Sequence, residues 1–179
     1  MRLFKHLNKN IFNNFMEQNA SYEAITKEFQ KCQQDNDFLQ IGWTFKLKDN
    51  NIYQWKVTIN GPKDTPYENG IFTILISFPP DYPLHGPEFK FLNKVYLINV
   101  DNTGKIIHLN LNQWAWVGKV KDYPDYDIKH ALLDIYSMFY YQTLESPINW
   151  HLAIQYRDNK QEFDKEAKKW TQEYATKPL

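Results

Sequence analysis

The stretch from Trp55 to Phe89 has the sequence WKVTINGPKDTPYENGIFTILISFPPDYPLHGPEF. Apolar residues alternate with other residues on both sides of a break at Gly61-Pro62: Tyr53, Trp55, Val57 and Ile59 before it, and Phe72, Ile74, Ile76 and Phe78 after it. This alternation is typical of strands with one buried face, and the prolines that follow Phe78 end the second strand.

Upstream, the alternation continues through Leu39, Ile41, Trp43, Phe45 and Leu47, and a turn at Asp49-Asn50-Asn51 separates it from Tyr53. Downstream, Glu88 to Leu92 has the composition of a short fourth strand. Short connections between neighbouring strands favour antiparallel pairing. We therefore predict a four-stranded antiparallel meander.

Helical spacing of apolar residues flanks the predicted sheet. It appears from Ser21 to about Asp35, from Ile128 to Phe139, and from Phe163 to Tyr174. A first helix, a meander and C-terminal helices predict the α+β class, with the helices packed against the sheet. Between residues 93 and 126 no period is visible, and a segment of this length in a compact domain predicts the functional site.

Bulk properties exclude several kinds of protein. The 179 residues suit one domain, and 21 basic against 21 acidic residues remove the positive field that nucleic-acid binding requires. The one cysteine, Cys32, excludes an intramolecular disulfide. No stretch is apolar for long enough to span a membrane, and no histidine spacing suits a metal, so we predict no metal and no cofactor.

Residues 1–16 combine basic residues with apolar positions, among them Phe4 and Phe12, that share one helical face. Three interpretations remain open: a docking helix, a mitochondrial address, or a peripheral membrane contact. We therefore predict an N-terminal extension at 1–20, a domain at 21–175 and a tail at 176–179, in a cytoplasmic or mitochondrial protein.

Several motifs carry a resemblance to a known family. Gly61-Pro62, the turn from Asp64 to Tyr67, Gly70-Ile71-Phe72, and Phe78-Pro79 followed by Asp81-Tyr82-Pro83 resemble the core of the ubiquitin-conjugating enzymes. The likeness extends over about residues 21–175 and implies that family's fold. It also implies a site at the family's His-Pro-Asn and Gly-x-Ile-Cys-Leu segments, which correspond here to Leu97-Ile98-Asn99 and to residues 104–108.

The resemblance places Ile107 at the position of the family's nucleophilic cysteine, with His108 as the other candidate because the interval to Trp114 is one residue short. The family holds ubiquitin as a thioester, a task that suits a thiolate because it is both a strong nucleophile and a good leaving group. Neither residue can replace a thiol. Asn99 and Ser146 match two further family positions and are interpreted as relics, while Cys32 is interpreted as structural.

The resemblance also implies binding positions at Leu84 and at Trp114, Ala115, Trp116 and Val117, where the loop up to residue 127 is longer than in the family. We predict that the protein is not an enzyme and acts as a binding or structural subunit of a multi-subunit complex. One alternative is a variant that binds ubiquitin or an active conjugating enzyme as a cofactor. A residual enzyme with a nucleophile other than cysteine is another.

Overall fold

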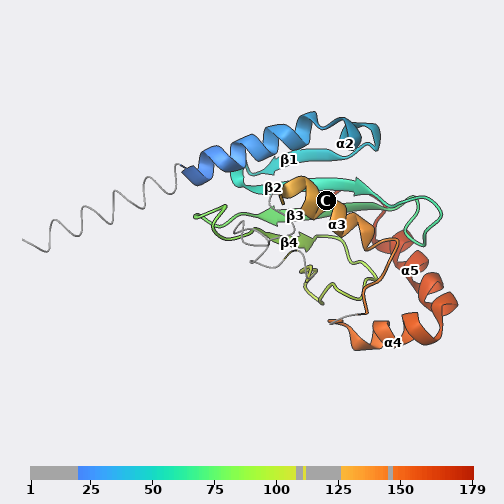
Figure 1. Ribbon diagram of the computed structural model, residues 1–179. Helices are drawn as coiled ribbons and strands as arrows, with labels where there is room; N and C mark the ends of the chain where they lie inside the picture. Colours follow the sequence, from blue (N-terminus) through green and yellow to red (C-terminus); the bar gives the residue numbers. More distant parts are fainter. Residues whose placement is uncertain (1–19, 108–110, 112–125, 145–146) are drawn as a thin grey trace, which may run out of the picture.

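The structure is a computed structural model that describes residues 20–107, 111, 126–144 and 147–179 (Figure 1). Residues 20–34 form the first helix. The elements that follow are α2 (Asn36–Gln40), β1 (Thr44–Lys48), β2 (Asn51–Asn60), β3 (Ile71–Ser77), β4 (Glu88–Phe91), α3 (Ile128–Ser137), α4 (Trp150–Asp158) and α5 (Lys160–Tyr174). The predicted α+β class is confirmed.

The four strands form one antiparallel sheet in the order β1-β2-β3-β4. The meander is therefore present as the alternation predicted. Along β2, Trp55, Val57 and Ile59 are buried, whereas the residues between them are partly exposed. The face that carries these three residues is thus apolar, and Lys56 and Thr58 lie on the other face.

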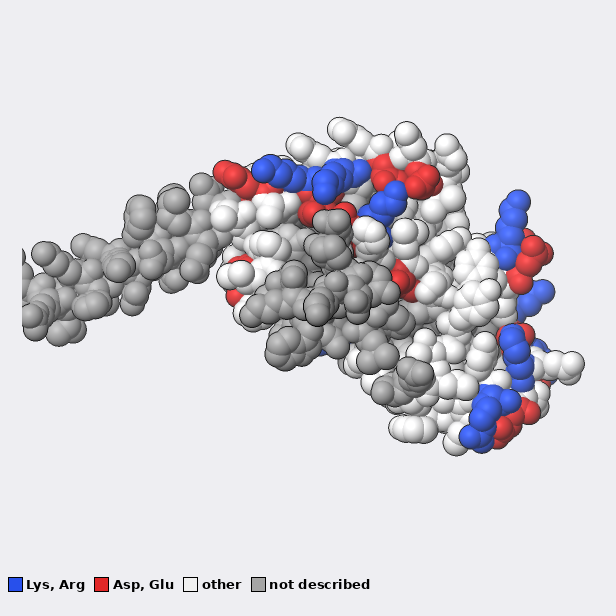
Figure 2. Space-filling view, in the orientation of Figure 1, with Lys and Arg blue, Asp and Glu red and all other residues white. Residues whose placement is uncertain are grey.

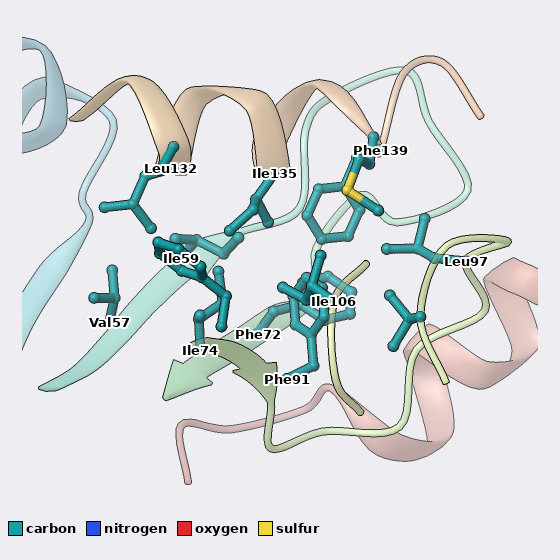
Figure 3. Close-up of a cluster of buried hydrophobic side chains, with 14 of the residues drawn as sticks. Val57, Ile59, Phe72, Ile74, Phe91, Leu97, Ile106, Leu132, Ile135 and Phe139 are labelled. Carbon is teal, nitrogen blue, oxygen red and sulfur yellow. The ribbon is translucent and has the colours of Figure 1, made fainter. Parts of the chain in front are cut away.

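The apolar face is covered by α3, which lies across the sheet in Figure 1. Leu132 and Ile135 of α3 are fully buried, and Figure 3 shows them pointing toward Ile59 and Ile74 of the sheet. The first helix packs beside them, where Phe29 meets Trp55 edge to face at 4.9 Å. These contacts hold α3 and the first helix against the sheet, next to the loop that follows β4.

The first predicted strand begins too early in the sequence. Leu39 lies in α2 and Ile41 caps it, and both side chains are exposed. The Asp35 side chain accepts hydrogen bonds from the N–H groups of Asp37 and Phe38, which starts a short helix in place of a strand. Gly42, at φ +76°, then turns the chain into β1.

Helix α4 was not predicted from the sequence. It begins where the side chain of Asn149 accepts a hydrogen bond from the N–H of Leu152. Only Leu152 and Ala153 are buried, so the helix has no apolar stripe from which to recognise it. Among the described residues, no helix has the length and apolar character needed to cross a membrane.

Candidate functional site at the loop after β4

The loop after β4 turns back on itself and forms a hairpin-like arm over residues 99–107. The N–H of Ile107 donates to the carbonyl of Asn99 at 2.9 Å, and that of Asp101 donates to the carbonyl of Lys105 at 3.0 Å. Val100 and Ile106 form an isolated bridge between these two bonds. The backbone therefore holds Ile107 beside Asn99.

The turn of the arm depends on Asp101 and Gly104. The Asp101 carboxylate accepts from the N–H and hydroxyl of Thr103 and from the N–H of Lys105, at 2.7–2.9 Å. The hydrogen bond from the Thr103 hydroxyl is the main cause that lowers the pKa of Asp101. Gly104 has φ +89°, and a Cβ there would lie 2.2 Å from the Phe91 carbonyl oxygen, so no other residue fits.

The arm is joined to the sheet through its second half. The N–H of Ile106 donates to Phe89 at 2.9 Å, and the N–H of Phe91 donates to Gly104 at 2.8 Å. Figure 3 shows the Ile106 side chain in the core next to Phe91. Ile106 is 5% exposed and Ile107 is 41% exposed. Alternation along the arm thus buries Ile106 and presents Ile107 at the surface.

The segment before the arm is fixed by Gln142, which follows α3. Its side-chain oxygen accepts from the N–H of Ile98 at 3.0 Å, and its nitrogen donates to the Met138 carbonyl at 2.7 Å. From the other side, the N–H of Asn149 donates to the carbonyl of Ile98 at 3.0 Å. Both backbone groups of Ile98 are therefore paired with segments far away in the sequence.

The hydroxyl of Tyr67 adds a further link to this support. It donates to the carbonyl of Tyr96 at 2.7 Å and lies 3.4 Å from the amide nitrogen of Gln142. Tyr67 is 1% exposed, and its burial raises its pKa well above the usual value for tyrosine. Tyr67 thus remains a neutral donor that holds the chain just before Asn99.

Leu97 and Ile98 are fully buried, and Asn99 is 3% exposed. Figure 3 shows the side chain of Leu97 turned into the core toward Phe139. In the segment that resembles His-Pro-Asn, two buried aliphatic residues, Leu97 and Ile98, are therefore followed by the buried side-chain amide of Asn99. The bond that ties Asn99 to the arm uses its backbone carbonyl.

Cys32 lies in a different environment from Asn99. It is 3% exposed on the first helix and lines a shallow pocket with Glu28 and with Asp127, which caps α3. Burial, together with the charges of Glu28 and Asp127, raises the pKa of the Cys32 thiol to about 12. A thiol of this kind is protonated at neutral pH and is a poor nucleophile.

An open cleft runs beside the arm, with a volume of about 440 Å³. Its lining includes Asp101 and Asn102 of the turn, His151 and Leu152 of α4, and Trp170 of α5. The cleft places polar side chains next to the segment that leads to Asn99. Among the described residues, no group of histidine, cysteine and acidic side chains is arranged to hold a metal ion.

Several predicted site residues lie outside the described residues: His108, Trp114, Ala115, Trp116, Val117, Ser146, Phe4 and Phe12. Of those described, Leu84 is 59% exposed on the turn after Asp81. Sequence reasoning missed Gln142, Tyr67 and His151. No local pattern marks Gln142 or His151, whereas Tyr67 lies in the motif from Asp64 that carried the resemblance.

Comparisons with known proteins agree on one family. The family model described as ubiquitin-conjugating enzyme matches residues 24–171. This chain belongs to the ubiquitin-conjugating enzyme family. A curated relative, ubiquitin conjugating enzyme E2 B of Dictyostelium discoideum, is 32% identical over 130 residues, which are 72% of this chain and 82% of that protein.

Solved structures give the same result. A ubiquitin conjugating enzyme from Plasmodium yoelii aligns with a TM-score of 0.75 and 32% identity, over 88% of this chain and 97% of that one. The E2 domain of a Toxoplasma gondii ubiquitin conjugating enzyme aligns with a TM-score of 0.69 and 32% identity, over 86% and 97%. The fold of the family therefore accounts for nearly all of the described residues.

Family membership corrects the prediction that the protein is not an enzyme. The relatives are named as ubiquitin conjugating enzymes, which is an enzyme family. The prediction inferred the loss of all activity from the loss of one nucleophile. The absence of a thiol at one aligned position does not by itself exclude enzymatic activity.

Proposed function

We propose that the protein takes part in ubiquitin conjugation as a binding subunit of a protein assembly. In this proposal the surface around the arm meets ubiquitin, or an active conjugating enzyme that carries it, without a thioester to this chain. One observation carries the proposal: Ile107, which the resemblance aligns with the family's cysteine, is held at the surface beside Asn99. The arm keeps a contact surface and presents an aliphatic side chain on it.

The alternative carrier within the chain is Cys32, and its surroundings argue against this role. A thioester needs an accessible thiolate, whereas Cys32 is buried and its pKa is raised to about 12. The acyl group would also have to enter between the first helix and the N-terminus of α3. Such an adduct would require the first helix to separate from the core.

Exposed apolar side chains supply the contacts that the proposal needs. Leu84 and Ile107 are both more exposed than core residues of their size, and each lies at a position that the family resemblance associates with binding or chemistry. At many protein interfaces a few residues contribute most of the binding energy, and Trp is enriched among them. We include Trp116 and its neighbours from Trp114 to Val117 in the same proposed surface.

The N-terminal extension, residues 1–20, is the second proposed contact, with Phe4 and Phe12 on its apolar face. In this scheme residues 21–175 supply the folded domain, and the extension attaches it to the assembly. Deleting residues 1–16, or replacing Trp116 with alanine, is expected to release the protein from its native assembly while the domain stays folded. Unchanged copurification of both variants would contradict these contacts.

A binding measurement tests the proposal at the arm. Immobilised protein is probed with ubiquitin and with an active conjugating enzyme charged with ubiquitin. Ile107→Asp is expected to weaken binding of at least one of them by about tenfold, because a carboxylate would be desolvated in the contact. Leu133→Asp is the matched control, since Leu133 is also 41% exposed but lies on α3. Equal losses in both variants would contradict a specific surface at the arm.

A further inference from the structure

Ile98 differs from the family's motif in the chemistry of its backbone. The resemblance aligns it with the proline of His-Pro-Asn, and proline has no backbone N–H. Ile98 therefore introduces a hydrogen-bond donor where the motif has none. The residue is fully buried, and a buried N–H that lacks an acceptor costs free energy. The fold of this chain must therefore supply an acceptor at this point.

The acceptor comes from Gln142, which follows α3. Its side-chain oxygen accepts the Ile98 N–H at 3.0 Å, across 44 residues of chain. The nitrogen of the same amide donates to the carbonyl of Met138 at 2.7 Å, at the end of α3. A side-chain amide suits this place because it accepts and donates at once. Gln142 thus links the end of α3 to the backbone of Ile98.

The backbone of Ile98 is also held from its other side. Its carbonyl accepts the N–H of Asn149, whose side chain caps α4 by accepting the N–H of Leu152. Among the described residues, Gln142 is the only one whose side chain bonds the backbone of Ile98. Without the Gln142 amide, Ile98 would be tied to the rest of the fold through its carbonyl alone.

A short path connects Gln142 to the exposed side chain of Ile107. Ile98 is followed directly by Asn99, whose carbonyl accepts the Ile107 N–H at 2.9 Å. Two hydrogen bonds, one at each end of the Ile98-Asn99 dipeptide, therefore connect Gln142 to the arm. A shift of Ile98 would move Asn99 and Ile107 together.

The distribution of charge indicates why such a shift would matter for binding. Figure 2 shows Lys, Arg, Asp and Glu gathered over the first helix and α2, and again over α4 and α5, with mainly uncharged side chains between them. Ile107 itself is aliphatic and 41% exposed. Apolar contacts depend on close packing, and a gap of about 1 Å already loses roughly half of the dispersion attraction. Their strength therefore follows the position of the backbone that presents them.

We propose that Gln142 is a positioning residue for the arm, acting through the backbone of Ile98 to hold Asn99 and Ile107 where a partner contacts them. In the family's motif, proline leaves no donor to satisfy. In this chain, the Gln142 amide satisfies the donor that Ile98 introduces. The effect on binding rests on the proposed function of the arm, whereas the effect on the position of Ile107 stands without it.

Amide hydrogen exchange, followed residue by residue on the full chain, tests the effect on position. Gln142→Ala is expected to speed exchange at Ile107 about tenfold more than at Ile74, which lies in the sheet and reports global unfolding. Gln142→Glu keeps an oxygen for the Ile98 N–H and loses the donor to Met138, so Ile107 should exchange at nearly its wild-type rate. Equal acceleration in both variants would show that Gln142 only caps α3, and would overturn the proposal.

A proline at residue 98 gives a second test by a double-mutant cycle. Ile98→Pro removes the N–H, and its ring would fill space now taken by the Gln142 oxygen, 3.0 Å from the Ile98 nitrogen. Gln142→Ala should therefore speed Ile107 exchange in the wild-type chain and leave it unchanged or slower in the Ile98→Pro chain. The same acceleration in both backgrounds would overturn the proposal. If Ile98→Pro does not fold, the comparison of Gln142→Glu with Gln142→Ala decides alone.

Binding to ubiquitin and to an active conjugating enzyme charged with ubiquitin tests the effect on the partner. Gln142→Ala should weaken, by about fivefold, the same binding that Ile107→Asp weakens, and Gln142→Glu should retain it. Gln161→Ala, at an exposed position of α5, is the control and should bind as the wild type does. If the wild type binds neither probe, the proposed function fails, and exchange at Ile107 still decides the role of Gln142. Unchanged affinity in Gln142→Ala would overturn the positioning role and leave the proposed function intact.

Discussion

The N–H of Ile107 donates to the carbonyl of Asn99 at 2.9 Å, so the two residues that the resemblance aligns with the family's cysteine and asparagine lie side by side. The register of the arm is set by backbone bonds, by the buried Ile106 and by the turn at Gly104, none of which involves the side chain of residue 107. The backbone of the arm would therefore hold a different side chain at residue 107 in the same place.

Replacing Ile107 with cysteine tests that geometry. We expect Ile107→Cys to form a reductant-sensitive adduct when incubated with activating enzyme, ATP and ubiquitin, because the thiol would be exposed and beside Asn99. His108→Cys is the competing variant from the other alignment, and Leu84→Cys controls for an exposed thiol elsewhere. An adduct on His108→Cys alone would show that residue 108, and not residue 107, corresponds to the family's cysteine.

Gln142 is expected to be essential for the segment before the arm. Gln142→Ala leaves the N–H of Ile98 without its acceptor in a buried position, which costs about 1–3 kcal/mol in the free energy of unfolding. Urea denaturation measures this loss, and hydrogen exchange should show reduced protection of the Ile98 amide. Gln161→Ala, at an exposed position of α5, should change neither quantity.

Two glycines offer a matched comparison. Gly104→Ala is expected to destabilise the protein by about 2 kcal/mol or more, because it combines a positive φ with a Cβ placed 2.2 Å from a backbone oxygen. Gly42→Ala also has a positive φ, but its nearest contact, at 3.2 Å, is the side chain of Asn60. It should cost about 1 kcal/mol. Equal losses on thermal or urea unfolding would argue against the close approach at Phe91.

Lys46 of β1 lies opposite Lys56 of β2, and this pair of like charges predicts a gain in stability when one positive charge is replaced. Lys46→Glu places a carboxylate opposite Lys56 and should raise the free energy of unfolding by about 0.2–1 kcal/mol at low salt. Lys48→Glu, which faces Asn51, should have a smaller effect. Urea denaturation measures both variants. Destabilisation by Lys46→Glu would contradict the pairing of Lys46 with Lys56.

The raised pKa of Cys32 predicts that the free energy of unfolding decreases at alkaline pH. Its folded pKa is raised from 9.0 to about 12, so the unfolded chain releases the thiol proton at a lower pH than the folded one. This contribution to stability is complete below pH 9.0 and declines as the pH rises toward 12. Cys32→Ala should flatten the decline between these values in urea denaturation. An unchanged slope would mean that the thiol is already accessible.

Much of the fold was predictable from the sequence because every second residue from Trp55 to Ile59 in β2 is buried, and α3 and α5 carry clear apolar stripes. The predicted first strand wrongly included Leu39 and Ile41, because they alternate as strand residues do but belong to a short helix that the cap at Asp35 begins. Helix α4 could not be recognised from apolar spacing, because only Leu152 and Ala153 of its side chains are buried. The strand boundaries of β3 and β4 differ from the predicted ones by a residue.

The site was predictable in part, and for a different reason. Ile107 and Asn99 came from the spacing of a family motif, and the arm then brings them together. Gln142 and Asn149 could not be found in this way, because their role comes from tertiary contacts with Ile98 across more than forty residues of chain. The pairing of Lys46 with Lys56 was equally hidden, since the two residues belong to different strands and are aligned only by the register.

The most direct test of the central claim, that this chain acts in ubiquitin conjugation by binding and not by carrying a thioester, is a charging assay. The wild-type protein and Cys32→Ala are incubated with activating enzyme, ATP and ubiquitin beside an active family member, and the products are separated without reductant. We predict an adduct on the active enzyme and none on either form of this protein. A reductant-sensitive ubiquitin adduct on the wild type that is absent from Cys32→Ala would contradict the claim.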